Sequence, residues 1–100
     1  MTGKKSNKYQ PLLQGKPQTQ GMKAGRVFLL PGQDCGKHST NANEEFLIFL
    51  AGKGEVITEK SVPLQVSAGR TSYIPSETIH NVRNIGDEPL IYIYCVAPIK

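Results

Sequence analysis

The sequence predicts an all-β domain, a small barrel or sandwich of about seven strands. Three observations favour this fold class. From residue 24 onward, short apolar runs alternate with Gly, Pro, Asn, Asp or Ser, and β-branched and aromatic residues are concentrated in these runs. The three- and four-residue spacing of an amphipathic helix is nowhere sustained.

The apolar runs give the expected strands in order. They are RVFLL, EFLIFLA, EVIT, PLQV, TSYI, HNVR and LIYIYCVA. Turn residues at 52–54 (GKG) and 84–89 (NIGDEP) predict two hairpins, the first joining EFLIFLA to EVIT and the second joining HNVR to LIYIYCVA. EFLIFLA and LIYIYCVA are apolar on both faces, so a second sheet or a twofold-related subunit must cover the second face. We therefore expect a homodimer.

The chain is long enough for one domain with a single core. Residues 1–23 are expected to form a basic, partly flexible arm, and residues 24–100 the barrel. The apolar YQPLL segment of the arm is expected to pack on the body or to pair with a partner chain. Residues 1–26 carry six basic residues and no acid, but they lack the dense cluster and interleaved aromatics of a nucleic-acid interface. Nucleic-acid binding is therefore not expected.

Compartment is inferred from apolar segments and cysteines. No apolar run approaches the roughly 20 residues that span a bilayer, and none follows the N-terminal lysines as in a secretory signal. Cys35 and Cys95 form no CxxC pair, which favours free thiols. These features predict a cytoplasmic protein without a membrane partner.

Residues 32–52, GQDCGKHSTNANEEFLIFLAG, contain the residue types of a chemical site. A phosphate-binding loop requires four residues between its first glycine and a GK pair, then Ser or Thr, then a helix. Here three residues separate Gly32 from Gly36, and His38 follows the lysine. A metal site fits better, because a closed sheet can bring His38, Glu45 and the distant His80 together.

The same stretch and residues 69–84 resemble the two signature motifs of the cupin superfamily. The first motif runs glycine, five residues, His-x-His, three or four residues, Glu, six residues, glycine. Its positions are occupied here by Gly32, His38, Thr40, Glu45 and Gly52. The second runs glycine, five residues, Pro-x-Gly, two residues, His, three residues, Asn. Its positions are occupied by Gly69, Pro75, Glu77, His80 and Asn84.

This resemblance implies a small double-stranded β-helix, or jelly-roll, barrel. It also implies that His38, Glu45 and His80 bind a divalent transition metal, Fe, Mn, Ni or Zn, beside a small polar ligand. Thr40 stands where the family has a further histidine ligand, and is expected to hydrogen-bond the ligand or a metal-bound water instead. Cys35 and Glu44 are alternative ligands, although strand alternation turns Glu44 away from Glu45.

The second departure from the family motifs is Glu77, which replaces a turn glycine. The replacement lowers the stability of the fold only slightly unless that position requires a positive φ. The resemblance does not choose an activity, because cupins include oxygenases and isomerases as well as non-catalytic sugar- or metabolite-binding barrels. A metal-dependent oxygenase or isomerase and a non-catalytic small-molecule-binding barrel, with or without a metal, both stay open, as does the question of enzyme or non-enzyme.

Overall fold

The structure, a computed structural model, describes residues 9–59 and 61–99. Within these residues the chain forms strands, turns and loops without a helix, so the all-β prediction is confirmed. It follows that the described residues contain no helix that could cross a membrane. The strands are β1 (Gln10–Gln14), β2 (Lys23–Leu29), β3 (His38–Ser39), β4 (Asn43–Ala51), β5 (Lys53–Thr58), β6 (Leu64–Ser67), β7 (Thr71–Ile74), β8 (Ile79–Asn84) and β9 (Leu90–Pro98).

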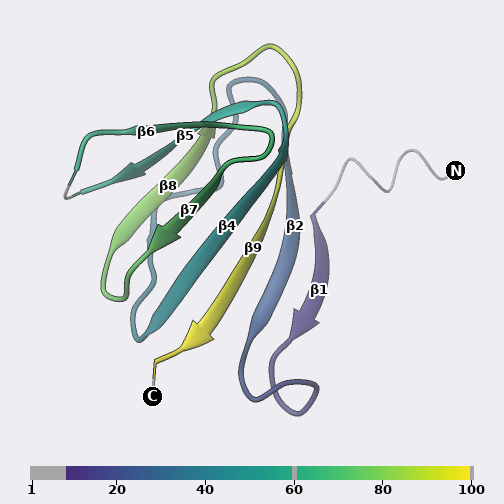
Figure 1. Cartoon of the computed structure of the whole chain (residues 1–100), viewed down its shortest axis with the longest axis vertical. Coiled ribbons are helices and arrows are strands. Elements are labelled where there is room, and N and C mark those ends of the chain that lie inside the picture. The colour runs from purple at the N-terminus through teal and green to yellow at the C-terminus, as the bar shows by residue number, and fades with distance from the viewer. Residues whose placement is uncertain (1–8, 60, 100) are drawn as a thin grey trace, which may run out of the picture.

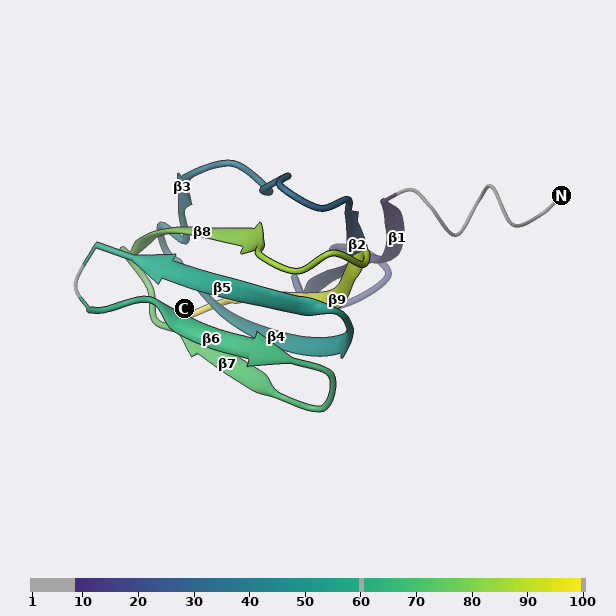
Figure 2. The ribbon, with the colours of Figure 1, turned by 90° about the horizontal axis from the view of Figure 1, so that it is seen from above.

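The strands form two antiparallel sheets (Figure 1). One has the order β1-β2-β9-β4-β7 and the other the order β3-β8-β5-β6. Seen from above, β5 and β8 of the four-stranded sheet lie across from β4 and β9 of the five-stranded sheet (Figure 2). The predicted jelly-roll arrangement is therefore confirmed.

The core lies between the two sheets. Alternate residues of β4 and β9 point inward, and they pair in register as Leu47 with Tyr94 and Phe49 with Tyr92. The buried cluster combines residues of both sheets: Leu29, Leu47, Phe49, Val56, Val66, Ile74, Val82, Leu90 and Tyr92. This second sheet covers the inner face of the two strands that the sequence showed to be apolar on both sides.

Neither of the two predicted hairpins forms. β4 pairs with β7 and β9, whereas β5 pairs with β6 and β8, so residues 52–54 carry the chain from one sheet to the other. Residues 84–89 make the same crossing from β8 to β9. Gly52 makes its corner possible, because its φ is +89° and a Cβ there would lie 2.3 Å from the carbonyl oxygen of Pro89. The turn residues were identified correctly, but at these positions they make corners between sheets.

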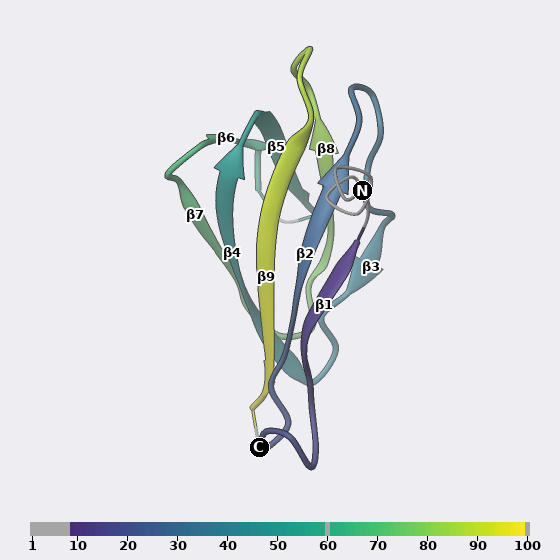
Figure 3. The ribbon, with the colours of Figure 1, turned by 90° about the vertical axis from the view of Figure 1, so that its right-hand side faces the viewer.

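The YQPLL segment pairs within its own chain. Strand β1 lies at the edge of the five-stranded sheet and pairs with β2, with Gln10 opposite Arg26 and Gln14 opposite Lys23. Viewed from the side, β1 runs along β2, and β2 lies between β1 and β9 (Figure 3). Residues 1–8 of the expected arm lie outside the described residues. The flexibility of the arm stays a prediction.

Candidate metal centre

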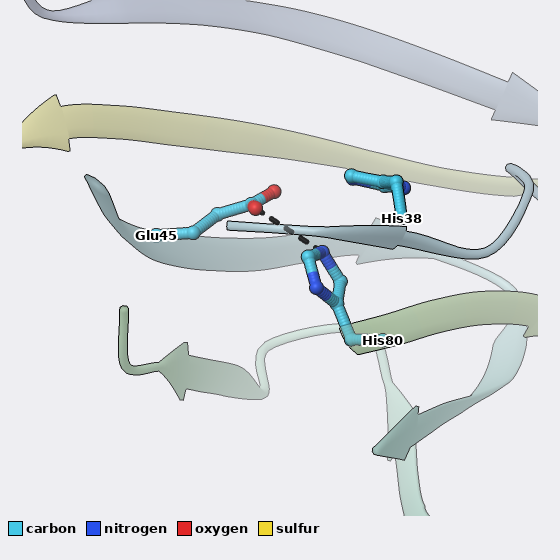
Figure 4. Close-up of side chains that lie close together, drawn as sticks. All are labelled: His38, Glu45 and His80. Atoms are coloured by element: carbon cyan, nitrogen blue, oxygen red, sulfur yellow. Dashed lines mark ion pairs between the residues drawn. The ribbon is translucent and has the colours of Figure 1, made fainter. Parts of the chain in front are cut away.

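The three expected ligand side chains converge between the two sheets (Figure 4). His38 on β3 lies directly opposite His80 on β8 in the register of the four-stranded sheet. Their rings are 4.3 Å apart between centroids. Glu45 comes from β4 of the facing sheet. The ligand atoms of these three residues all lie within 4.8 Å of one another, a spacing that one cation can bridge once the side chains close on it.

His80 is buried and is held by a backbone carbonyl. Its Nδ1 lies 3.1 Å from the carbonyl oxygen of Thr78 and donates to it, since a carbonyl oxygen only accepts. The neutral ring then carries a bare lone pair on Nε2. That atom lies 3.2 Å from Oε1 of Glu45, close enough for an ion pair but not aligned for a hydrogen bond, and no other partner within the described residues satisfies it.

The charge of His80 depends on this neighbour. Burial disfavours the imidazolium, but Glu45 and the Thr78 carbonyl together outweigh burial and raise the pKa of His80. A proton is therefore one way to satisfy the two facing atoms. A metal ion is the other, because a nitrogen lone pair and a carboxylate oxygen are both ligands for divalent transition metals.

His38 lies at the exposed end of the group. Its Nδ1 donates to the carbonyl oxygen of Gly36 at 2.8 Å, which leaves Nε2 free. Both imidazoles are thus oriented by backbone carbonyls, the usual arrangement around histidine ligands. The residues present fit a two-histidine, one-carboxylate metal site.

Thr40 has a structural role that the sequence does not reveal. Its hydroxyl donates to the carbonyl oxygen of Pro75 at 2.7 Å and accepts from the backbone N–H of Thr78 at 3.1 Å. These bonds tie the end of β3 to the turn between β7 and β8. Thr40 also lines the cavity, but its hydroxyl hydrogen is already donated to the Pro75 carbonyl oxygen. Its binding of a ligand or water stays a prediction.

The two alternative ligands lie elsewhere. Glu44 points to the outer face of the sheet and accepts a hydrogen bond from the Tyr73 hydroxyl at 2.8 Å. Cys35 lines the cavity, but its Sγ contacts Asn81 and the Gly36 carbonyl and does not belong to the converging group. Burial is the main cause that raises the pKa of the Cys35 thiol, which disfavours the thiolate that a metal would require.

A cavity of about 520 Å³ adjoins the three side chains, within the usual range for small-molecule sites. Its walls include Val27, Val82, Tyr92, Tyr94 and Val96. Tyr92 and Tyr94 are therefore wall residues, whereas Tyr73 lies on the outer surface. Tyr9 at the mouth was not foreseen. Gly25 directly precedes the expected RVFLL strand and lies within β2, where a glycine often marks a close approach by another group.

Comparison with known proteins agrees with this architecture. Residues 25–96 match the family model of the cupin domain, and the chain belongs to this family. An uncharacterized protein of Methanocaldococcus jannaschii is 36% identical over 61 residues, covering 61% of this chain and 48% of the relative. A protein of Streptomyces cyaneus named polyketide synthase CurC is 29% identical over 76 residues, covering 75% of this chain and 48% of the relative. The chain thus spans about half the length of these curated relatives.

A solved structure shows the same fold. The cupin-like protein of Thermotoga maritima superimposes with a TM-score of 0.82 at 21% identity, covering 91% of this chain and 68% of that one. At this level of identity the likeness shows the fold alone.

Proposed function

We propose that this cupin binds one divalent transition metal, Fe, Mn, Ni or Zn, through His38, Glu45 and His80, with a small molecule bound beside it in the cavity. The observation that carries the proposal is the contact between Nε2 of His80 and Oε1 of Glu45. Two electron-pair donors buried face to face need a proton or a cation between them. A two-histidine, one-carboxylate set with open positions suits these metals.

The chain's own residues would position both the ion and the ligand. Once bound, a divalent metal supplies Lewis acidity toward oxygen atoms of the ligand. The carbonyls of Gly36 and Thr78 hold the two imidazoles in orientation, and Glu45 contributes the negative charge that offsets the cation. Apolar side chains, among them Val27, Val82 and Val96, line the cavity beside these residues.

A non-catalytic binding module is the second candidate, and the composition of the cavity wall favours it. Among the described residues that line the cavity, Glu45 is the only carboxylate and there is no lysine. Burial raises the pKa of Tyr92 and of Tyr94, so these phenols stay protonated. Apart from the ligands themselves the wall offers no evident general base, and an oxygenase or isomerase would have to rely on the metal.

Oxygen uptake separates these two classes. The metal-loaded protein should be tested with diols, thiols and keto acids, and with a polyketide because of the name of the Streptomyces cyaneus relative. Uptake with one compound class would support an oxygenase. Saturable binding with neither uptake nor conversion of the compound would support the binding module.

Elemental analysis tests the metal proposal itself. Protein purified without a metal-affinity tag is expected to carry a transition metal, and His38→Ala and His80→Ala are each expected to lose it. Equal metal content in the parent and both variants would contradict the assignment of these ligands.

We also propose that the outer face of the five-stranded sheet joins two copies of the chain. Phe46, Leu50 and Tyr73 are 41%, 45% and 59% exposed there. Apolar side chains gathered on one face commonly mark an interface. Light scattering should find a dimer for the parent and a monomer for Phe46→Glu. The control is Val62→Glu, which adds the same charge at an 82% exposed loop residue outside the sheets and should stay dimeric. A monomeric parent would contradict the proposal.

A further inference from the structure

Two tyrosines meet at the mouth of the cavity, above a glycine. Tyr94 on β9 lies directly opposite Gly25 on β2, and Tyr9 precedes β1 on the other side of β2. Their rings are nearly parallel, with an interplanar angle of 9° and centroids 6.2 Å apart, and their hydroxyls are hydrogen-bonded. The edge strand β1 thus brings a residue from the start of the described chain to the cavity formed by the motif residues.

Gly25 is needed for space. It is not among the residues with positive φ, so its backbone does not require glycine. A Cβ there would lie 2.7 Å from the Tyr9 hydroxyl and 2.8 Å from the Tyr94 ring, closer than non-bonded atoms approach. Any side chain at this position would therefore push the two phenols apart.

Away from the three metal-site residues, the cavity offers little to an anionic ligand. Within the described residues, its wall contains no lysine or arginine, and Glu45 is its one acidic side chain. Burial, followed by the hydrogen bond with Tyr9, raises the pKa of Tyr94, so this phenol stays uncharged near neutral pH. One hydroxyl of a hydrogen-bonded phenol pair keeps its proton free to donate to an acceptor. The lining also includes the phenol ring of Tyr92 and the side chains of Val27, Val82 and Val96.

We propose that Tyr9, Tyr94 and Gly25 form an aromatic subsite that selects uncharged, ring-containing ligands. The ring would pack against the tyrosines and a neutral oxygen would accept the free phenol proton. This inference rests on the proposed small-molecule function of the cavity and names its ligand class. It gives the N-terminal strand a role in specificity, since β1 positions Tyr9.

A matched pair of probes tests the charge preference. 2-Naphthol and 2-naphthoate share one ring system and differ in charge at neutral pH. Their binding should be measured by fluorescence on chelator-treated protein, so that no metal can capture the carboxylate. Desolvating the carboxylate without a cation should make 2-naphthoate bind at least about tenfold more weakly than 2-naphthol. Equal or tighter binding of 2-naphthoate, or no measurable binding of 2-naphthol, would overturn the proposal.

Three variants test the residues. Tyr9→Ala should weaken 2-naphthol binding by about three- to tenfold, the worth of one aromatic contact. Gly25→Ala should do the same by displacing the phenols. Val62→Ala removes an exposed side chain outside both the cavity and the proposed dimer face, and should bind as the parent does. Should Gly25→Ala fail to fold, the test rests on Tyr9→Ala, and an affinity equal to that of Val62→Ala would contradict the subsite.

Metal content keeps this test separate from that of the proposed function. Tyr9→Ala is expected to retain as much metal as the parent, because Tyr9 is not among the converging ligands. A parent that binds metal but shows no preference for 2-naphthol would contradict the subsite alone. A parent that binds no metal but still prefers 2-naphthol would contradict the metal site alone.

Discussion

Nε2 of His80 lies 3.2 Å from Oε1 of Glu45, across the gap between the two sheets. Residues 35 positions apart meet because β8 and β4 belong to facing sheets and both side chains point inward. His38 joins them as the cross-strand neighbour of His80. The site therefore depends on correct packing of the two sheets as well as on the identity of its residues.

The turn before His80 holds a residue in a strained conformation. Glu77 has a φ of +54°, the left-handed region that glycine adopts without cost. Its backbone N–H donates to the carbonyl oxygen of Asn41 at 2.8 Å, a bond that glycine would keep. We expect Glu77→Gly to raise the free energy of unfolding by about 0.5–1 kcal/mol in urea titrations.

Gly69→Ala is the converse control. Gly69 has a φ of +89° and open space where a Cβ would be, so alanine should destabilise through the backbone alone, by about 1 kcal/mol. An unchanged or lower stability of Glu77→Gly would contradict the strain argument.

Thr40 can be tested as a structural hydroxyl. Thr40→Val keeps the shape but leaves the buried N–H of Thr78 without its acceptor, and should lower the free energy of unfolding by about 2 kcal/mol. Thr40→Ser keeps the hydroxyl and should lose less. Metal content should be the same in both variants, because the hydroxyl is already bonded to protein. Loss of metal in Thr40→Val with full stability would instead make Thr40 part of the metal site.

Stability at high pH should depend on Tyr92. Burial, followed by the nearby Cys35 and Glu45, raises the pKa of Tyr92 well above the ordinary 10.0. Above pH 10 the unfolded chain releases this proton while the folded chain keeps it, so stability falls as pH rises, by up to about 1.4 kcal/mol per pH unit. Urea titrations from pH 8 to 11 should give a shallower decline for Tyr92→Phe. Equal slopes would show that Tyr92 ionises without unfolding.

Motif spacing and alternation predicted much of the site. The gap between Glu45 and Gly52 selected Glu45 over Glu44, and the structure places Glu44 on the outer face with Tyr73. The side chain of Asn84, the last residue of the second motif, bonds Glu88 and Gly86 around the 84–89 corner. These features are local, or are fixed by strand periodicity.

The remaining features depend on contacts between distant segments. Turn residues at 52–54 do not reveal whether the strand after the turn pairs with the strand before it or crosses to the other sheet. The close approach of Pro89 to Gly52 decides between these two arrangements. The positive φ of Glu77 follows from packing of its turn against Asn41. Tyr9 reaches the cavity only because β1 pairs with β2. The sequence of the YQPLL segment does not show whether it pairs within its own chain or with another chain.

The central claim is that Glu45 and the two histidines share one cation. Calorimetric titration of the chelator-treated protein with Mn²⁺ or Zn²⁺ tests it most directly, with Glu45→Gln set against its sequence neighbour Glu44→Gln. We predict that Glu45→Gln lowers the affinity by at least about tenfold, since it replaces an anionic ligand with a neutral one, and that Glu44→Gln binds as the parent does. Equal affinities in the two variants, or no binding by the parent, would contradict the account.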